Sequence, residues 1–368
     1  MSFVFESMTS KGHEEVVFCS DNNTGLKAII AIHNTTIGPA LGGCRMWSYN
    51  SEAEALQDVL RLSRGMSYKA AIAGLNLGGG KAVIIGDSKK NKNEILFRSF
   101  GRFVQGLAGR YITAEDVGTS VKDMEWVRME TEYVTGLSRA LGGGGDPGPV
   151  TALGTFSGIR ATVKKHLNRD SLTGLKVAVQ GVGHVGYHLT KHLTEAGAEV
   201  LVSDLDEKAL KLVANDFGVK VIEVDQIYDA EVDIYSPCAM GSTLNDQTIP
   251  KLKCSIVAGS ANNQLKDEIT HSQMLKNQDV LYAPDYAINS GGLINCANEI
   301  EGYNRKRAFQ QAEGIYDTLM NIYDRADSDN VTTHEAALKE AKKRINDISK
   351  LKNVYLPKKN LMGKRDSN

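Results

Sequence analysis

The sequence predicts an α/β fold with two domains, and three observations support this prediction. The chain has 368 residues, about the length of two domains of ordinary size. Through its second half, short apolar runs alternate with amphipathic segments, as in a parallel sheet covered by helices. A glycine- and proline-rich run, LGGGGDPGPV at 141–150, interrupts the pattern. We therefore expect a substrate-binding domain over 1–145 and a doubly wound nucleotide-binding domain over 146–329.

The first domain mixes strand and helix patterns. We expect strands at 27–33, 81–86 and 110–116, and helices at 51–66, at 94–107 and from Ser120 onward. Ser51 with Glu54, and Ser120 with Asp123, have the spacing of capping boxes, which begin helices. The segment GPALGGCRMW at 38–47 is expected to be a glycine-rich loop.

The second domain is expected to alternate strands and helices. Strands are expected at 175–181, 199–204, 232–237, 254–260 and 280–285, and helices at 184–196 and 207–217. Residues 291–324 have a mostly helical pattern. A last helix at 333–351, within a segment of about 330–368, is expected to pack back on the first domain. The tail at 358–368 is polar, and we expect it to be frayed.

The composition excludes several classes of protein. With 42% apolar residues, 24% charged residues and a net charge of −1, the chain lacks the basic excess of nucleic-acid-binding proteins. No apolar run approaches the roughly 20 residues of a membrane-spanning helix, and the N-terminus lacks the pattern of a signal peptide. Five cysteines without a CxxC pair favour reduced thiols and no structural zinc. We therefore expect a cytoplasmic protein.

A dinucleotide-binding motif lies where the first strand of the second domain meets its helix. The segment GVGHVG at 181–186 matches GxGxxG, whose glycines allow a tight turn, close approach of a pyrophosphate and close helix packing. Asp204 ends the next strand, at the spacing of the carboxylate that binds the adenosine ribose. Because its charge would repel a 2′-phosphate, we expect NAD rather than NADP. The motif residues expected to contact the cofactor are Gly181, Gly183, His184, Val185 and Gly186.

Three histidines follow one face of the same expected helix. His184, His188 and His192 are spaced i, i+4 and i+8, which could bind a metal ion. A single helix rarely completes a metal site, and the usual carboxylate partners are not apparent in the sequence. We therefore expect no metal site.

Two lysines and an aspartate in the first domain are candidates for chemistry. Lys81 lies between three glycines and an apolar run in GLNLGGGKAVIIG, Lys69 precedes it by twelve residues, and Asp116 follows a strand. Lysine is rarely buried unless it is paired or functional, although a solvated amine is the commoner explanation for either lysine alone. Together the three residues fit a small anionic substrate that must lose a proton. We expect the glycines beside Lys81 to make room for that substrate.

Seven segments resemble the amino acid dehydrogenases of the glutamate/leucine/phenylalanine/valine family, and leucine-specific members match best. They are GPALGGCRMW, GMSYKAA, GLNLGGGKAVIIGD, GRYITAEDVGTS, GVGHVGYHL, AGSANNQL and YAPDYAINSGGLINCANE. The resemblance runs from about Val16 to Tyr323. It implies reversible, NAD-dependent oxidative deamination of an L-amino acid to a 2-oxo acid and ammonia. It also implies a homo-oligomer, with an octamer favoured.

The resemblance implies roles for individual residues. Lys69 and Asn263 would bind the substrate carboxylate, Lys81 would be the general base that activates water, and Asp116 would transfer protons near the amine. Burial and a neighbouring cation would favour the neutral amine that a lysine base requires. The residues that the resemblance implies near the nicotinamide are Thr151, Cys238, Ala239 and Asn263.

The substrate side chain is expected to be aliphatic. The other substrate-binding residues that the resemblance implies are Leu41, Gly42, Ala114, Leu293 and Cys296. A glutamate carboxylate would lose its hydration among them, so we expect a branched-chain substrate, with leucine first. Leu293 and Cys296 replace the valines of leucine-specific enzymes, which keeps phenylalanine or valine as the alternative. An NAD-binding sensor without turnover is the alternative of another class, since it would not need Lys81.

Overall fold

The computed structural model describes residues 3–351, which divide into two compact units. The first unit contains the described residues up to Asp146, the segment Cys296–Arg305 and the described residues from Ala341 onward. The second contains Pro147–Asn295 and Lys306–Glu340. Within residues 3–351, no helix is long and apolar enough to cross a membrane. The polar tail expected at 358–368 lies outside the described residues.

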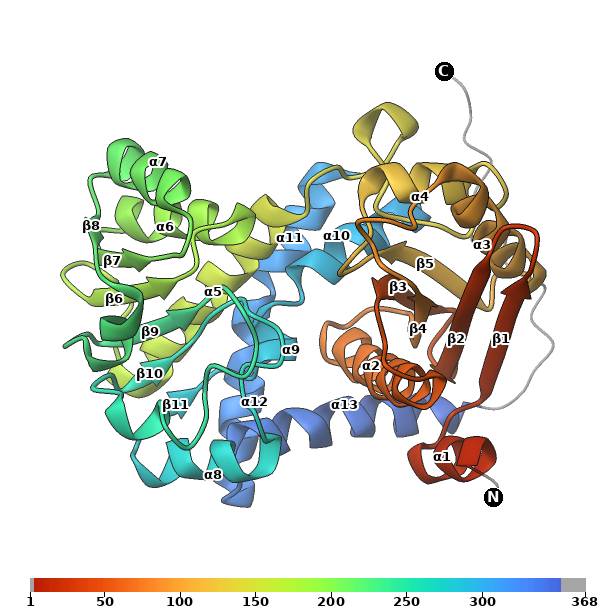
Figure 1. Ribbon diagram of the computed structural model, residues 1–368. Coiled ribbons are helices and arrows are strands. Elements are labelled where there is room, and N and C mark those ends of the chain that lie inside the picture. The colour runs from red at the N-terminus through yellow and green to blue at the C-terminus, as the bar shows by residue number, and fades with distance from the viewer. Residues whose placement is uncertain (1–2, 352–368) are drawn as a thin grey trace. The chain divides into compact units, whose positions relative to one another are not determined.

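The first unit contains a five-stranded mixed sheet (Figure 1). In sheet order its strands are β1 (Glu15–Asp21), β2 (Leu26–Asn34), β4 (Gly78–Ile85), β3 (Ala40–Trp47) and β5 (Tyr111–Glu115). β3 is parallel to β4 and β5, whereas β2 is antiparallel to β1 and β4. The expectation of a loop at 38–47 was wrong, because most of this segment is β3. Glycine fits there because a side chain at Gly42 would overlap the carbonyl oxygen of Gly80.

Helices cover both faces of this sheet. α2 (Glu52–Ile72) packs on one face, and α3 (Glu94–Gly106) and α4 (Val121–Arg128) pack on the other. Successive residues of β2 point to opposite faces, so that Ile29 packs with α2 whereas Ile30 packs with α3 and α4. A short helix, α1 (Phe3–Lys11), precedes the sheet.

The helices begin at the expected capping residues. The Ser51 hydroxyl accepts a hydrogen bond from the backbone N–H of Glu54 at 3.1 Å, and the Asp123 carboxylate accepts one from the backbone N–H of Ser120 at 2.9 Å. α2 is longer than expected and continues to Ile72, because its last turns keep a buried face. Lys69 therefore lies on this helix, in its last turn.

The second unit contains a six-stranded parallel sheet, which confirms the expected doubly wound α/β fold. In sheet order its strands are β11 (Leu281–Tyr282), β10 (Ile256–Val257), β9 (Ile234–Pro237), β6 (Lys176–Gln180), β7 (Glu199–Ser203) and β8 (Lys220–Val221). Numbered from β6 and read from β8, the order is 3-2-1-4-5-6. This is the strand order of dinucleotide-binding folds.

The helices in the second half of the chain differ from expectation at several places, one of which is the helix Glu268–Asn277, where the sequence analysis expects none. The sequence does not predict α5 (Gly148–Leu167), because its first turn, GPV, resembles a loop; proline is nevertheless tolerated in a first turn. The helical region expected at 291–324 is interrupted after α10, where Gly302 adopts φ +83°. From Gly148 onward the helices are α5, α6 (His184–Glu195), α7 (Glu207–Phe217), α8 (Glu268–Asn277), α9 (Asp285–Ile288), α10 (Gly291–Ile300), α11 (Arg305–Glu313), α12 (Ile315–Asp329) and α13 (Thr333–Ser349). The end of α10 from Cys296 and the end of α13 from Ala341 belong to the first unit.

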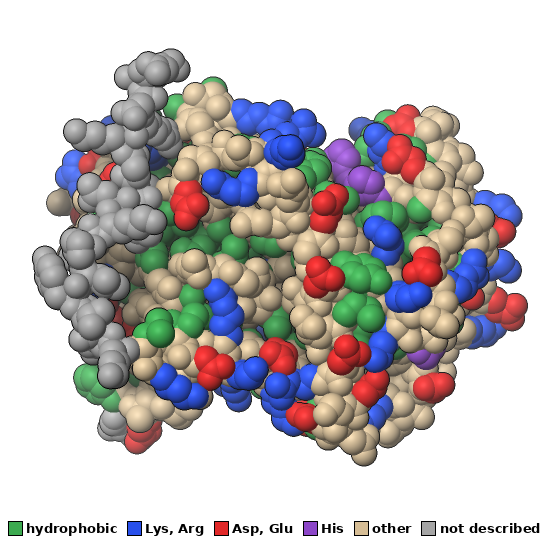
Figure 2. All heavy atoms as spheres, turned by 180° about the vertical axis from the view of Figure 1, so that it is seen from behind, with side chains coloured by type: hydrophobic (Ala, Val, Ile, Leu, Met, Phe, Trp, Pro, Cys, Tyr) green, Lys and Arg blue, Asp and Glu red, His purple; other side chains and the backbone are tan. Residues whose placement is uncertain are grey.

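Charges of both signs are mixed on the face of the molecule that Figure 2 shows. Lys and Arg side chains lie among Asp and Glu side chains across that face. This distribution agrees with the net charge of −1 and differs from the basic stripe of a nucleic-acid-binding surface.

Candidate active site

An ion pair joins the buried Lys81 and the half-buried Asp116 in the first unit. Lys81 lies on β4 and is 5% exposed, whereas Asp116 directly follows β5. The two strands flank β3 and run in the same direction, so the aspartate reaches the lysine across β3. Lys81 Nζ lies 3.1 Å from Asp116 Oδ1. An amine and a carboxylate are therefore within the distance that proton transfer requires.

Arg45 on β3 also holds Asp116, and the sequence analysis does not identify it. Arg45 Nε donates to Asp116 Oδ2 at 3.0 Å. Burial raises the pKa of Asp116, but the positive charges of Lys81 and Arg45 outweigh burial and keep this pKa below its ordinary value. The carboxyl is therefore ionised at neutral pH. A charged residue inside the apolar run of GGCRMW is the signal that could have found Arg45.

Asp58 on α2 extends this network of charges. It accepts hydrogen bonds from Arg45 Nη1 at 2.9 Å, from the Tyr49 hydroxyl at 2.7 Å and from Arg61 Nη2 at 3.0 Å. Burial opposes ionisation of Asp58, but these three partners keep its pKa below the ordinary value. The charges alternate in sign from β4 to α2, so each partly buried charge faces an opposite one, which offsets its loss of hydration.

Gly79 and Gly80 pack against protein atoms, so the expectation that they make room for substrate was wrong. A side chain at Gly79 would overlap the backbone of Ser67 on α2. One at Gly80 would press on the ring of Tyr111. Gly79 therefore lets β4 lie close to α2, the helix that carries Lys69, whereas Gly80 makes room for the Tyr111 ring.

Lys69 lies near Cys296 of α10. Burial raises the pKa of the Cys296 thiol to about 12; the Glu299 and Glu115 carboxylates add to this rise, and the Lys69 ammonium opposes it. The thiol is therefore neutral at physiological pH. The Lys69 and Glu115 charges therefore both act on the Cys296 thiol, which belongs to the same unit.

The remaining pocket candidates are buried. Leu41 and Gly42 lie on β3, and Ala114 lies on β5 opposite Gly43. The carbonyl oxygen of Gly42 accepts a hydrogen bond from the Tyr111 hydroxyl at 2.6 Å. Leu293 lies on α10 in the second unit and is 8% exposed.

The dinucleotide-binding candidates of the second unit gather at the carboxyl ends of four strands. Gly181 follows β6, Asp204 follows β7, Cys238 follows β9, and Asn263 lies in the loop after β10. The strand order reverses between β6 and β9. In doubly wound folds, ligands bind outside the carboxyl ends of the strands at this reversal.

The glycines of the motif have different surroundings. Gly181 adopts φ +98°, and a side chain there would overlap Ala239. A side chain at Gly186 would overlap the carbonyl oxygen of Gly181. Gly183 precedes the first residue of α6, and apart from its own neighbours in the chain no atom of the described residues lies within 4 Å of where its side chain would begin. That open space at a helix N-terminus fits a pyrophosphate group.

Asp204 is fixed against the glycine loop by backbone donors. Its Oδ2 accepts a hydrogen bond from the N–H of Val182 at 2.7 Å, and its Oδ1 accepts one from the N–H of Asp206 at 2.9 Å. Each carboxylate oxygen can accept more than one hydrogen bond, so acceptor capacity remains for ribose hydroxyls.

The candidates for the nicotinamide end lie on loops and on α5. The Thr151 hydroxyl donates to the carbonyl oxygen of Pro147 at 2.9 Å. Asn263 adopts φ +50°, and its carbonyl oxygen accepts a hydrogen bond from the N–H of Ser242 at 2.7 Å. Burial raises the pKa of the Cys238 thiol, which is therefore neutral at physiological pH.

The histidines of α6 have separate surroundings. The His192 ring packs on Phe156 with 5.5 Å between the ring centroids, and burial lowers the pKa of His192. The ring of His188 meets that of Tyr187 edge to face. Within residues 3–351, no three His, Cys, Asp or Glu side chains are arranged to hold a metal ion.

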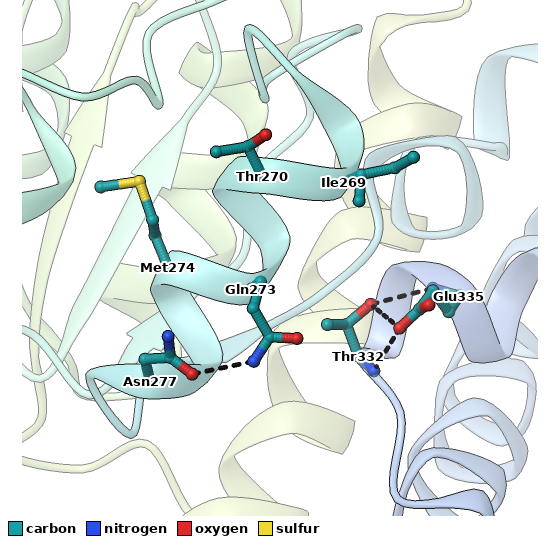
Figure 3. A pocket seen from close by; sticks show the side chains of 7 residues that line it. All are labelled: Ile269, Thr270, Gln273, Met274, Asn277, Thr332 and Glu335. Carbon is teal, nitrogen blue, oxygen red and sulfur yellow. Dashed lines mark hydrogen bonds between the residues drawn. The ribbon is translucent and has the colours of Figure 1, made fainter.

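A cavity of about 410 Å³ in the second unit contains none of these candidates. Figure 3 shows that residues of α8 line it together with Thr332, just before α13, and Glu335 in the first turn of α13. Its polar groups are engaged locally, since Glu335 accepts hydrogen bonds from Thr332, and Gln273 donates one to Asn277. The lining residues are Ile269, Thr270, Gln273, Met274, Asn277, Thr332 and Glu335.

Two family models match nearly the whole chain. The model of the Glu/Leu/Phe/Val dehydrogenase dimerisation domain matches residues 13–133, and that of Glutamate/Leucine/Phenylalanine/Valine dehydrogenase matches residues 142–208 and 202–356. The leucine dehydrogenase of Thermoactinomyces intermedius is 53% identical over 353 residues, 96% of each chain. The phenylalanine dehydrogenase of the same organism is 46% identical over 358 residues, 97% of this chain and 98% of that protein. The crystal structure of L-tryptophan dehydrogenase from Nostoc punctiforme matches with a TM-score of 0.84 and 47% identity, covering 94% of this chain and 99% of that one.

Proposed function

Because this chain belongs to the glutamate/leucine/phenylalanine/valine dehydrogenase family, we propose that it catalyses the reversible oxidative deamination of L-leucine with NAD+. The reaction consumes water and yields a 2-oxo acid, ammonium, NADH and a proton. The observation that carries the proposal is the ion pair of the buried Lys81 with the half-buried Asp116, which supplies a base and a proton acceptor in one place.

Lys81 acts as the general base in the fraction of the enzyme whose lysine amine is neutral. It takes a proton from the water that attacks the imino carbon of the oxidised substrate. Asp116, 3.1 Å from the lysine amine, receives that proton and returns it to the departing nitrogen. NAD+, when bound, accepts the hydride from the substrate Cα. The burial of Lys81 limits the access of bulk water to these proton transfers.

Lys69 and Asn263 hold the substrate carboxylate. An ammonium and an amide N–H₂ both donate hydrogen bonds, and the charge of Lys69 makes its bond to a carboxylate charge-assisted. Fixing the carboxylate orients the Cα that loses the hydride.

The cofactor is NAD rather than NADP. The open space at Gly183 accommodates the pyrophosphate, and the Asp204 carboxylate accepts hydrogen bonds from the adenosine ribose. The charge of Asp204 disfavours a 2′-phosphate. Thr151, Cys238 and Ala239 line the nicotinamide end.

The substrate side chain is aliphatic. Leu41, Ala114, Leu293 and Cys296 offer apolar groups or a neutral thiol, and a charged side chain would be left without a partner among them. Leucine is favoured because several leucine dehydrogenases are among the relatives. Tryptophan and phenylalanine dehydrogenases are also similar, so an aromatic amino acid is the second candidate substrate.

Turnover with a panel of amino acids tests this proposal. Purified protein is mixed at alkaline pH with NAD+ and with L-leucine, L-isoleucine, L-valine, L-phenylalanine, L-tryptophan or L-glutamate, and NADH absorbance is followed. We expect the highest kcat/KM with L-leucine, little with L-glutamate, and a loss of rate when NADP+ replaces NAD+. If kcat/KM is highest with L-phenylalanine or L-tryptophan, the substrate of the protein is an aromatic amino acid and not leucine. No turnover with any substrate, with NAD still bound, would indicate a sensor.

We further propose that the protein is a cytoplasmic homo-oligomer, with an octamer favoured. The match of residues 13–133 to a dimerisation domain supports an oligomer. All five cysteines are free thiols, which agrees with a reducing compartment. Light scattering of the purified protein measures the number of subunits.

A further inference from the structure

The Arg344 side chain on α13 donates hydrogen bonds to the turn that follows α2, which we call the clasped turn (residues 70–76). Arg344 and the residues of this turn, 70–76, all belong to the first unit, although 268–274 positions of sequence separate the arginine from its hydrogen-bond acceptors. The Nη1 atom donates to the carbonyl oxygens of Leu75 at 2.7 Å, Ala71 at 3.0 Å and Ala70 at 3.5 Å; the Nη2 atom donates to the carbonyl oxygen of Gly74 at 3.1 Å and to Asn76 Oδ1 at 3.2 Å.

The turn is closed by backbone hydrogen bonds without the help of Arg344. The N–H of Leu75 donates to the carbonyl oxygen of Ala70 at 3.1 Å, and the N–H of Gly74 donates to that of Ala71 at 3.2 Å. With Gly74 at φ +71°, these bonds form the Schellman motif that ends many helices. At Ala70 and Ala71, Arg344 therefore uses the second lone pair of a carbonyl that already has a backbone partner, and at Gly74 and Leu75 it adds a donor to carbonyls of the turn itself. Its contribution is to fix where this turn lies.

A guanidinium suits this position better than other cations. Its five N–H groups lie in one plane, so they reach several carbonyl oxygens at once, whereas an ammonium is a point charge. The positive charge also faces the negative end of the α2 dipole. Among the described residues, the recorded acceptors of Arg344 are amide oxygens and none is a carboxylate.

The clasped turn is the covalent link between Lys69 and Lys81. Lys69 precedes the first clasped residue, Ala70, and its carbonyl oxygen accepts a hydrogen bond from the N–H of Ala73 at 3.1 Å. The turn then leads through residues 74–77 into β4, which carries Lys81. A displacement of the turn would therefore move the end of α2 relative to β4.

We propose that Arg344 is a positioning residue for the amino acid substrate: by holding residues 70–76 it sets the separation of the Lys69 and Lys81 amines. This inference rests on the proposed roles of those two lysines. A substrate whose carboxylate is bound by Lys69 has its reacting carbon in reach of the Lys81 amine only if that separation is kept. Misplacement of reacting groups by about 1 Å can cost about 100-fold in rate.

The test compares Arg344→Gln with Arg344→Lys and with Lys343→Ala, an exposed neighbour on the same helix. For Arg344→Gln we expect KM for L-leucine to rise about tenfold or more while KM for NAD+ stays within about twofold. Arg344→Lys keeps the charge but not the planar fork, so its KM should lie between those of wild type and Arg344→Gln. Lys343→Ala should match wild type. Hydrogen exchange of the amides at 70–76 should be faster in Arg344→Gln.

A double-mutant cycle with Lys69→Ala identifies the group through which Arg344 acts. In the Lys69→Ala background, Arg344→Gln should change KM for L-leucine by less than about twofold, because the ammonium that it positions is gone. Additive effects, or equal rises in KM for L-leucine and NAD+, would overturn the inference and indicate a general structural role. If Lys69→Ala itself leaves KM unchanged, the proposed role of Lys69 fails and this inference fails with it. A raised KM in Lys69→Ala with an unchanged KM in Arg344→Gln would overturn the inference alone.

Discussion

Arg45, Asp116 and Lys81 form a network in which each charge is stabilised by its neighbours. Isolated buried charges lose several kcal/mol of hydration, so one partner cannot be removed without consequence for the other. Asp116 lies between two cations, and removal of either one would make its ionised form less stable. The acid side of the pH profile of the enzyme is therefore expected to depend on Arg45.

Arg45→Met should shift the acid limb of kcat/KM to higher pH. The pKa of Asp116 is lowered by its cations, so the carboxylate persists as the pH falls and is lost only below its ordinary range. Without the arginine this pKa rises, and activity is lost at a higher pH. The pH profile of kcat/KM for L-leucine measures the shift, which we expect to be about one pH unit, within the range found for a charged neighbour.

Arg61→Met is the matched control for that experiment. Arg61 contacts Asp58, the other partner of Arg45, but it is more than half exposed and has no recorded contact with Asp116. Its acid limb should coincide with that of wild type. An equal shift in both variants would mean that the general charge of the region, and not the contact between Arg45 and Asp116, sets the pH dependence.

At the scale of single residues, the sequence predicts Lys81 as a site residue but neither Arg45 nor Arg344. Lys81 stands out because glycines and apolar residues surround it in the chain. The partners of Arg45 and Arg344 lie 13 to 274 positions away, so their contacts appear only when the sheet and α13 are in place. An arginine in the polar sequence of α13 carries no local signal.

At the scale of elements, the packing of β4 on α2, together with the turn that Arg344 holds, determines where the two candidate lysines lie. The sequence analysis predicts both elements, but it ends α2 too early and assigns the β4 glycines to the substrate. Periodicity identifies an element by its apolar face, whereas a glycine needed for close approach depends on the neighbouring backbone. For that reason the contact of Gly79 with Ser67 could not be predicted.

Gly79→Ala should destabilise the protein. Its new methyl group would overlap backbone atoms of Ser67, which cannot move aside as the end of a side chain can. Overpacking of this kind costs about 1–3 kcal/mol. We expect a lower midpoint of urea unfolding and, since α2 shifts, a higher KM for L-leucine.

Gly65→Ala on α2 is the control, because we expect this substitution to leave the free energy of unfolding unchanged or to increase it. Gly65 has open space where its side chain would begin, and alanine favours helix by about 0.5–1 kcal/mol over glycine. Its unfolding midpoint should equal or exceed that of wild type. Equal midpoints for Gly79→Ala and wild type would show that β4 and α2 tolerate a wider separation.

At the scale of the whole molecule, the sequence predicts the class of fold and most elements of the second unit. Its strands are short, apolar and separated by helices, so the local pattern and the final topology agree. The first unit is predicted less well, because β1 and β3 carry polar residues and glycines that resemble loops. Candidate site residues occur in both units, with Lys81 and Asp116 in the first and the glycine motif in the second.

The measurement that most directly tests the account is single-turnover and steady-state kinetics of Lys81→Ala, with NAD+ binding measured on the same protein. We predict that kcat for L-leucine falls at least about 100-fold, the lower range for loss of a general base, while the Kd of NAD+ is unchanged. Lys90→Ala, an exposed lysine beyond the end of β4, should keep wild-type kcat. A Lys81→Ala enzyme with near wild-type kcat would contradict the assignment of Lys81 as the base.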